Sequence, residues 1–197
     1  MNAQTSSRIA AIQMVSGPAV EGNLEIAGRL LAEAAARGAQ LAALPEYFGI
    51  LGMKDTDKVA VREAEGDGPI QRFLSDAAKM HGMWIVGGSA PLVSSDAGKV
   101  RNSSLVYDAN GNQVARYDKI HLFQLDNGSE QFDEARTIMH GRDPVGFDLP
   151  SRDGHVYVCD RVNNRIQVFR KDGSFVTEWI YEPSTLGAGA VWDLNFW

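Results

Sequence analysis

Hydrophobic residues in the first half of the chain switch between short continuous runs and helical spacing. Apolar runs at residues 8–15, 39–44 and 83–88 predict buried strands. Residues 24–38 and 68–82 place apolar side chains three and four positions apart, which predicts amphipathic helices. We expect Asn23 to cap the first helix and Gly38 to stand at its C-terminal end. The pattern therefore predicts strand, helix, strand, helix and strand in that order.

A hairpin and then a change of pattern follow these elements. Residues 103–118 predict two strands joined at Asn110-Gly111, a dipeptide typical of hairpin turns. Beyond about residue 150 the helical spacing disappears, and short strands are expected at residues 155–160, 165–170 and 175–179. The sequence therefore predicts an α/β layered domain over residues 1–150 and a short antiparallel β-meander over residues 151–197.

Composition and charge narrow the classes of partner. The 197-residue chain has a net charge of −6, whereas nucleic acids and anionic membranes attract basic surfaces. It has no apolar run long enough for a transmembrane helix, and its N-terminus lacks the pattern of a signal peptide. The single cysteine, Cys159, cannot form an internal disulfide. We therefore expect a cytoplasmic protein with no nucleic-acid and no membrane partner.

Three charged residues follow predicted strands or lie in loops, where scaffolds present functional groups: Glu46, Lys119 and Glu134. A carboxylate and an ammonium beside the thiol of Cys159 would form a coherent hydrolytic site. The carboxylate would take the thiol proton, the thiolate would attack a carbonyl carbon, and the ammonium would stabilise the resulting oxyanion. Any one of these charged residues, taken alone, is more often a surface charge than a catalytic group. The hypothesis of a hydrolytic site therefore depends on all of them occurring together.

Several motifs in a specific order support that set. They are AAIQM (10–14), GNLEIAGRLLAEAAARGAQLAALPEYF (22–48), GGSAP (87–91), RNSSLVYDANGNQVARYDKIHLF (101–123) and FDEARTIMHGRDPVGFDLP (132–150). In combination these motifs resemble the nitrilase superfamily, the carbon–nitrogen hydrolases, and its omega-amidase-like branch in particular. The resemblance implies a nitrilase-type α-β-β-α layered sandwich, of which this chain holds a part.

The resemblance also implies roles for individual residues. Glu46 corresponds to the general base, Lys119 to the oxyanion-stabilising cation, and Glu134 to the glutamate that positions the substrate and the lysine. The implied reaction cleaves the C–N bond of a small amide through a thioester on the cysteine, with a small-molecule amide as partner. The resemblance implies no cofactor and no metal, and the four histidines show no metal-ligand spacing.

Cys159 supports two interpretations. It follows the FDLP segment (147–150) at about the spacing of the family's nucleophile, but the residues after it do not match the family's pattern. Residues 151–197 instead resemble an NHL repeat, one blade of a β-propeller, in which Cys159 would be buried within a sheet. Cys159 is therefore either a nucleophile or a packing residue in a β-meander that serves as a binding module.

The nitrilase-like part is expected to be truncated. A complete domain needs a second half to finish the sandwich, and its absence would leave one sheet face and edge uncovered. We therefore expect marginal stability or self-association into a homo-oligomer. A third interpretation follows from the abrupt change near residue 150, namely that the chain is a non-catalytic fragment or fusion.

Overall fold

The computed structural model describes residues 8–147, 155–160, 165–170 and 174–180, which fall into two compact units. The larger unit contains residues 8–147 and holds both long helices. The smaller unit contains three strands between residues 155 and 180. Each unit has its own sheet.

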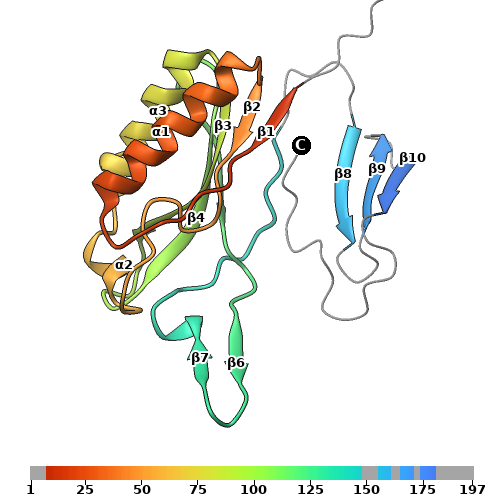
Figure 1. Ribbon diagram of the computed structural model, residues 1–197. Helices are drawn as coiled ribbons and strands as arrows, with labels where there is room; N and C mark the ends of the chain where they lie inside the picture. The colour runs from red at the N-terminus through yellow and green to blue at the C-terminus, as the bar shows by residue number, and fades with distance from the viewer. Residues whose placement is uncertain (1–7, 148–154, 161–164, 171–173, 181–197) are drawn as a thin grey trace, which may run out of the picture. The chain divides into compact units, whose positions relative to one another are not determined.

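A five-stranded mixed sheet forms the centre of the larger unit, in the order β1-β2-β3-β4-β5 (Figure 1). Its first three strands are parallel, and β4 and β5 continue the sheet as an antiparallel hairpin. The strands are β1 (Ile9–Ala11), β2 (Leu41–Ala43), β3 (Trp84–Val93), β4 (Val100–Tyr107) and β5 (Gln113–Asp118). The predicted mixed α/β arrangement is confirmed in this unit.

Two helices connect the parallel strands and cover the same face of the sheet (Figure 1). Helix α1 (Val20–Ala36) joins β1 to β2, and helix α3 (Pro69–His81) precedes β3. Gly38 has φ +80° directly after α1, so it accepts the left-handed conformation expected at a helix C-terminus. A one-turn helix, α2 (Asp57–Ala60), lies in the connection before α3.

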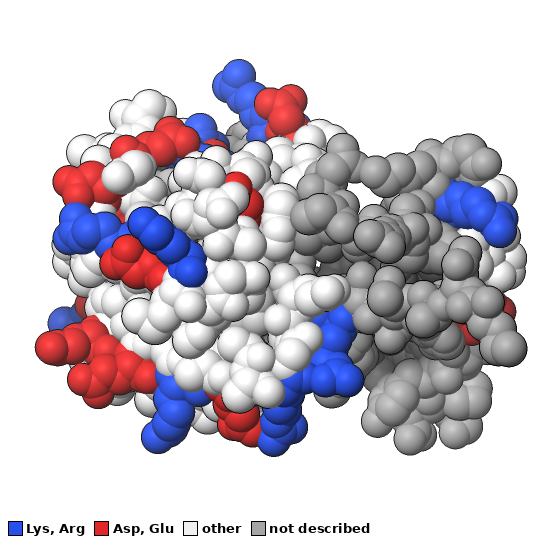
Figure 2. Space-filling model, turned by 90° about the horizontal axis from the view of Figure 1, so that it is seen from above, with Lys and Arg blue, Asp and Glu red and all other residues white. Residues whose placement is uncertain are grey.

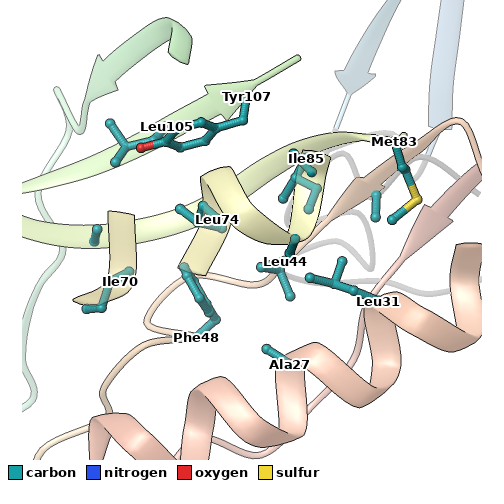
Figure 3. Close-up of a cluster of buried hydrophobic side chains, with 14 of the residues drawn as sticks. Ala27, Leu31, Leu44, Phe48, Ile70, Leu74, Met83, Ile85, Leu105 and Tyr107 are labelled. Atoms are coloured by element: carbon teal, nitrogen blue, oxygen red, sulfur yellow. The ribbon is translucent and has the colours of Figure 1, made fainter. Parts of the chain in front are cut away.

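The hydrophobic core lies between these helices and the sheet (Figure 3). Leu31 of α1 and Leu74 of α3 are fully buried, as are Ile85 of β3 and Leu105 of β4. Burying a side chain of this size stabilises the fold by roughly 1.5–3 kcal/mol. The face of each predicted helix that carries apolar residues at helical spacing is therefore the face that packs on the sheet.

Asn23 does not cap α1, so the predicted start of this helix is wrong. The helix begins at Val20, and Asn23 is buried inside its first turns. Its side chain accepts a hydrogen bond from the backbone N–H of Gly17 and donates to the carbonyl oxygens of Gly17 and Gly49, at 2.7–3.0 Å. Asn23 therefore ties the segment before α1 to the segment that follows β2.

The β4–β5 hairpin confirms the predicted strands, but its loop is longer than a two-residue turn. Residues 108–112 form the loop, with Gly111 at φ +83°. The Asp108 side chain accepts hydrogen bonds from the backbone N–H groups of Asn110 and Asn112, at 2.8 and 2.9 Å. These side-chain bonds stabilise a wider loop than the Asn-Gly pattern predicts.

A second hairpin was not predicted from the sequence. It consists of β6 (Gln124–Asp126) and β7 (Gln131–Asp133) and is followed by the short 3-10 helix η1 (Glu134–Arg136). The hairpin extends away from the five-stranded sheet (Figure 1). In the sequence this hairpin lies between two predicted site residues, Lys119 after β5 and Glu134 at the start of η1.

The smaller unit is a three-stranded antiparallel sheet in the order β10-β9-β8. Its strands are β8 (His155–Asp160), β9 (Arg165–Arg170) and β10 (Phe175–Ile180). In this ladder the backbone of Cys159 lies opposite Ile166.

Charged side chains of both signs lie on the face of the described residues that Figure 2 shows. On the face shown in Figure 2, basic and acidic side chains are interspersed, with no single broad basic patch among the described residues. In the part of the chain that the structure describes, no helix is both long and apolar enough to cross a bilayer.

Candidate active site

Glu46 lies just beyond β2, at the carboxyl end of a parallel strand, where functional groups of α/β sheets gather. The segment leading to it passes very close to β3. A Cβ atom on Gly88 would come within 2.1 Å of the carbonyl oxygens of Leu44 and Pro45. Glycine at position 88 is therefore what allows the chain to place Glu46 against β3.

Tyr47 holds the turn that presents Glu46. It has φ +58°, a left-handed conformation that is uncommon outside glycine. Its backbone N–H donates to Oγ of Ser89 at 2.9 Å, and its hydroxyl donates to Oε1 of Glu134 at 3.0 Å. Burial and the nearby carboxylates of Glu134 and Glu46 raise the pKa of Tyr47, so its hydroxyl remains a donor.

Lys119 directly follows β5, and two backbone hydrogen bonds fix its main chain. Its N–H donates to the carbonyl oxygen of Asn102 on β4 at 2.9 Å, and its carbonyl accepts from the N–H of Gly141 at 2.7 Å. A Cβ atom on Gly141 would come within 2.1 Å of the carbonyl oxygen of Asp118. The segment around Gly141 therefore packs directly against the residue that precedes Lys119.

Glu134 begins η1 and is only 5% exposed. Its Oε2 accepts a hydrogen bond from the backbone N–H of Phe123 at 2.7 Å, and its Oε1 accepts from the hydroxyl of Tyr47 at 3.0 Å. A buried carboxylate needs such partners because water no longer solvates it. The base of the second hairpin and the Glu46 turn together hold Glu134 in place.

These three predicted residues meet at the ammonium of Lys119. Its Nζ lies 3.0 Å from Oε1 of Glu46 and 2.9 Å from Oε2 of Glu134. The side-chain amide of Asn102 donates to the same Oε1 of Glu46 at 2.7 Å. In the described part of the chain no hydrogen bond reaches the other oxygen of Glu46, whose side chain is 45% exposed. One carboxylate oxygen is therefore free to act on a reacting group.

The pKa shifts are consistent with this charge arrangement. Burial alone would lower the pKa of Lys119, but hydrogen bonds to Glu134 and Glu46 outweigh it and raise that pKa. Burial alone would raise the pKa of Glu134, but hydrogen bonds from Phe123, Lys119 and Tyr47 lower it. Lys119 is therefore a cation and Glu134 an anion at neutral pH.

Cys159 is the predicted site residue that belongs to the smaller unit. Its backbone belongs to β8 in the smaller unit, and its side chain lies outside the described residues. The predicted convergence of Cys159 with Glu46 and Lys119 stays a prediction.

Sequence reasoning missed Asn102 and Tyr47. Tyr47 is the residue after Glu46, so its place in the same motif was a usable signal. Asn102 is a buried polar residue in a strand, and only the pairing of β4 with β5 shows that it lies near Lys119. Among the described residues, no group of His, Cys, Asp and Glu side chains is arranged to hold a metal ion.

Comparisons with known proteins place this geometry in context. A family model described as "Carbon-nitrogen hydrolase" matches residues 8–196. The match runs through β8, β9 and β10, and nothing in the comparisons supports an NHL repeat there. The alternative of a separate binding module is therefore not favoured.

Individual relatives agree with the family match. Omega-amidase NIT2-B of Xenopus laevis is 34% identical over 154 residues, which are 77% of this chain and 54% of that protein. Omega-amidase NIT2 of Homo sapiens is 35% identical over 148 residues, which are 74% of this chain and 52% of that protein. The chain thus spans about half the length of these relatives.

A solved structure shares the fold. The C. elegans NitFhit protein has a TM-score of 0.61 at 24% identity, over 71% of this chain and 35% of that one. At this identity the likeness shows the fold alone, and it agrees with the mixed sheet and helices of the larger unit.

Proposed function

This chain belongs to the carbon–nitrogen hydrolase family, and from that premise we propose that it hydrolyses small amides through a thioester intermediate. The observation that carries the proposal is the contact of Lys119 with both Glu46 and Glu134, at 3.0 and 2.9 Å. A fixed ammonium beside a carboxylate with one free oxygen supplies an oxyanion-stabilising cation and a proton acceptor in one place. Cys159, the only thiol in the chain, is the proposed nucleophile.

The proposed reaction begins with proton transfer from the thiol of Cys159 to Glu46. The thiolate forms a bond to the amide carbonyl carbon, and the carbonyl oxygen becomes an oxyanion. When the C–N bond breaks, the carboxylic acid of Glu46 returns its proton to the leaving amine, and ammonia departs. Glu46 then takes a proton from water, which attacks the thioester. The C–S bond breaks, and the products are a carboxylic acid and the restored thiol.

Lys119 is proposed to stabilise the oxyanion in both halves of the reaction. Its pKa is raised, so it carries a full positive charge when the negative charge develops. Glu134 is proposed to position Lys119 rather than to react, because it is buried and both its oxygens already accept hydrogen bonds. Removing one such stabilising group typically costs about 10²–10³ in kcat.

We also propose that residues 1–150 form part of an α-β-β-α sandwich and that the chain acts as a homo-oligomer in the cytoplasm. Support for the sandwich comes from the sheet face opposite the helices. Trp84 alternates with the core residue Ile85 along β3, and it stacks on Phe147 with ring centroids 6.2 Å apart. This face therefore carries apolar contacts of its own. The domain boundary near residue 150 belongs to the same proposal.

Ammonia release from a panel of small amides tests the proposed function. The comparison uses the unmodified protein, Cys159→Ala and Glu46→Gln, with Glu21→Gln on the exposed start of α1 as the matched control. We expect turnover in the unmodified protein and the control, and its loss in both site variants while circular dichroism shows them folded. Full turnover by Cys159→Ala would show that the thiol is not the nucleophile.

A further inference from the structure

Two Asn-Gly pairs occur in the sequence, Asn110-Gly111 and Asn127-Gly128, and the structure holds them differently. Gly111 is anchored to helix α3. Its carbonyl oxygen accepts a hydrogen bond from Oγ of Ser75 at 2.6 Å, and a Cβ atom on it would lie 2.7 Å from the carbonyl oxygen of Ser75. Gly128 lies in the loop at the tip of the β6–β7 hairpin, where an added Cβ atom would meet nothing within 4 Å outside its chain neighbours (Figure 1). The backbone of the second pair can therefore turn without disturbing any packing.

The backbone nitrogen that follows an asparagine can attack the side-chain carbonyl carbon of that asparagine once it has lost its proton. The attack closes a small ring, the succinimide, and glycine hinders it least because glycine has no Cβ. The N–H of Gly111 donates to a backbone carbonyl oxygen, that of Asp108, at 2.9 Å. The N–H of Gly128 donates instead to Oδ1 of Asp126 at 3.0 Å, and this side chain is exposed and can turn away. The nitrogen of Gly128 is therefore the more easily released.

The side-chain carbonyl of Asn127 is polarised by its neighbours. Its Oδ1 accepts hydrogen bonds from the backbone N–H and the hydroxyl of Ser129, at 3.0 and 2.8 Å, and from the backbone N–H of Glu130 at 2.7 Å. Donors placed in this way stabilise the negative charge that develops on the oxygen when the carbonyl carbon is attacked. In the described part of the chain no hydrogen bond holds Nδ2 of Asn127, which is exposed, so ammonia can leave into solvent.

We propose that Asn127 is a self-modification site, at which the chain deamidates without an enzyme to aspartate and isoaspartate. Hydroxide removes the proton from the backbone nitrogen of Gly128, and this nitrogen forms a bond to Cγ of Asn127. The bond from Cγ to Nδ2 breaks, and the leaving nitrogen takes a proton from water and departs as ammonia. Water then adds to either carbonyl of the succinimide and opens the ring. The complete reaction consumes one water and releases one ammonia, with no oxidation or reduction.

The isoaspartate product loosens the hairpin that holds Glu134. It adds a methylene group to the backbone between β6 and β7, and a negative charge beside Asp126 and Glu130. Because the loop sets the register of a hairpin, a longer loop backbone weakens the strand pairing. At the other end of this hairpin Glu134 accepts a hydrogen bond from the N–H of Phe123 and donates its own N–H to the carbonyl oxygen of Phe123, at 2.7 and 3.0 Å. The modification therefore acts on the position of Glu134.

Comparison of the two Asn-Gly pairs tests the structural selection. The protein is incubated folded and in urea at mildly alkaline pH, and tryptic peptides 102–116 and 120–136 are followed by mass spectrometry, with fragment ions locating the modified residue. In the folded protein we expect Asn127 to deamidate at least about tenfold faster than Asn110, and in urea we expect similar rates. Equal rates in the folded protein, or faster reaction at Asn110, would overturn the proposal.

Two variants at the hairpin tip test the chemistry. Asn127→Gln should abolish the reaction in peptide 120–136, because its longer side chain closes a ring far more slowly, and Asn110→Gln is the matched control that should leave that reaction unchanged. Ser129→Ala should slow deamidation of Asn127 about threefold to tenfold, since one donor to the carbonyl oxygen is lost. Faster deamidation in Ser129→Ala would show that these hydrogen bonds protect Asn127, and it would overturn the assigned chemistry.

Hydrogen exchange tests the effect on Glu134. We expect the backbone amides of Phe123 and Glu134 to exchange faster after prolonged incubation of the unmodified protein, but not after the same incubation of Asn127→Gln. An unchanged exchange rate in fully deamidated protein would overturn the proposed loosening of the hairpin. Neither deamidation nor hydrogen exchange depends on amide turnover, so the outcome is independent of the proposed function.

Discussion

Asn102 and Lys119 donate hydrogen bonds to the same oxygen of Glu46, at 2.7 and 3.0 Å. The two donors are also joined to each other, because the backbone N–H of Lys119 donates to the carbonyl oxygen of Asn102. Strand β4 and the residue after β5 thus fix Glu46 from one side. Its second oxygen keeps no partner among the described residues, so the carboxylate is oriented before any substrate binds.

Replacing Asn102 tests this orientation. We expect Asn102→Ala to lower kcat for amide hydrolysis about tenfold, because Glu46 loses one of its two fixed donors. Asn102→Asp should lower kcat further, since it places a second negative charge beside Glu46. Gln131→Ala, on the exposed β7 strand, is the control. Steady-state kinetics at neutral pH provide the measurement, and an unchanged kcat in Asn102→Ala would contradict the assigned role.

The lowered pKa of Glu134 predicts how stability depends on pH. A carboxylate whose pKa is lower in the folded state stabilises the fold above its unfolded value, ordinarily 4.5. That contribution is lost as pH falls through the folded pKa. Urea unfolding of the unmodified protein and Glu134→Gln should therefore differ by about 1–3 kcal/mol at pH 7, and the difference should shrink below pH 4.5. A difference that stays constant with pH would contradict the assigned ionisation.

The raised pKa of Lys119 has the opposite dependence. A cation whose pKa is higher in the folded state stabilises the fold fully below its unfolded value, ordinarily 10.5. The stabilisation is lost as pH rises through the folded pKa. We expect Lys119→Met to unfold more easily than the unmodified protein at pH 8, and the gap to narrow well above pH 10.5. Lys54→Met, at an exposed position between β2 and α2, serves as the control, and an equal loss of stability in that variant would contradict the role of the Lys119 ion pairs.

Two glycine substitutions test the close approach of the Glu46 segment to β3. We expect Gly88→Ala to destabilise the fold by several kcal/mol and to reduce activity, because the added Cβ would lie 2.1 Å from two backbone oxygens. Gly22→Ala places its Cβ in open space inside α1, so it should stabilise by up to about 1 kcal/mol. Thermal unfolding of both variants gives the comparison. Equal melting temperatures would contradict the packing described for Gly88.

Glu63 is expected to matter for stability rather than for activity. Its buried carboxylate accepts hydrogen bonds from the backbone N–H groups of Ile70 and Gln71, at 2.6 and 3.1 Å, at the start of α3. We expect Glu63→Ala to cost about 1–3 kcal/mol by denaturant unfolding, because buried donors lose their acceptor. Asp67→Ala removes an exposed ion pair with Arg72 and should cost under about 1 kcal/mol. Equal losses of unfolding free energy in Glu63→Ala and Asp67→Ala would contradict the stabilising role of the buried Glu63 carboxylate.

The fold was predictable where hydrophobic periodicity is strong. Helix α3 lies within one residue of its predicted limits at each end, because Pro69 and Gly82 mark its ends in the sequence. The start of α1 was mispredicted because Asn23 has a residue type common at caps, whereas its side chain binds the backbone of two distant segments. The β6–β7 hairpin was missed because its three-residue strands are exposed and lack an apolar period.

The candidate site was predictable to the extent that motifs carry it. Glu46, Lys119 and Glu134 stand in recognisable segments, and the structure brings them within hydrogen-bonding distance. Asn102 could not be found in that way. Its relation to the site depends on the pairing of β4 with β5, which is not visible in local sequence.

The reactivity of the single thiol shows whether Cys159 works together with Glu46. Iodoacetamide labelling of Cys159 is followed by intact mass in the folded protein, in Glu46→Gln and in Lys119→Met, with urea-unfolded protein as the reference. We expect rapid labelling of the folded protein and at least about tenfold slower labelling in Glu46→Gln, because the thiolate forms through that carboxylate. A thiol that labels only in urea, or equally fast in all folded variants, would contradict the claim that Cys159 works with Glu46.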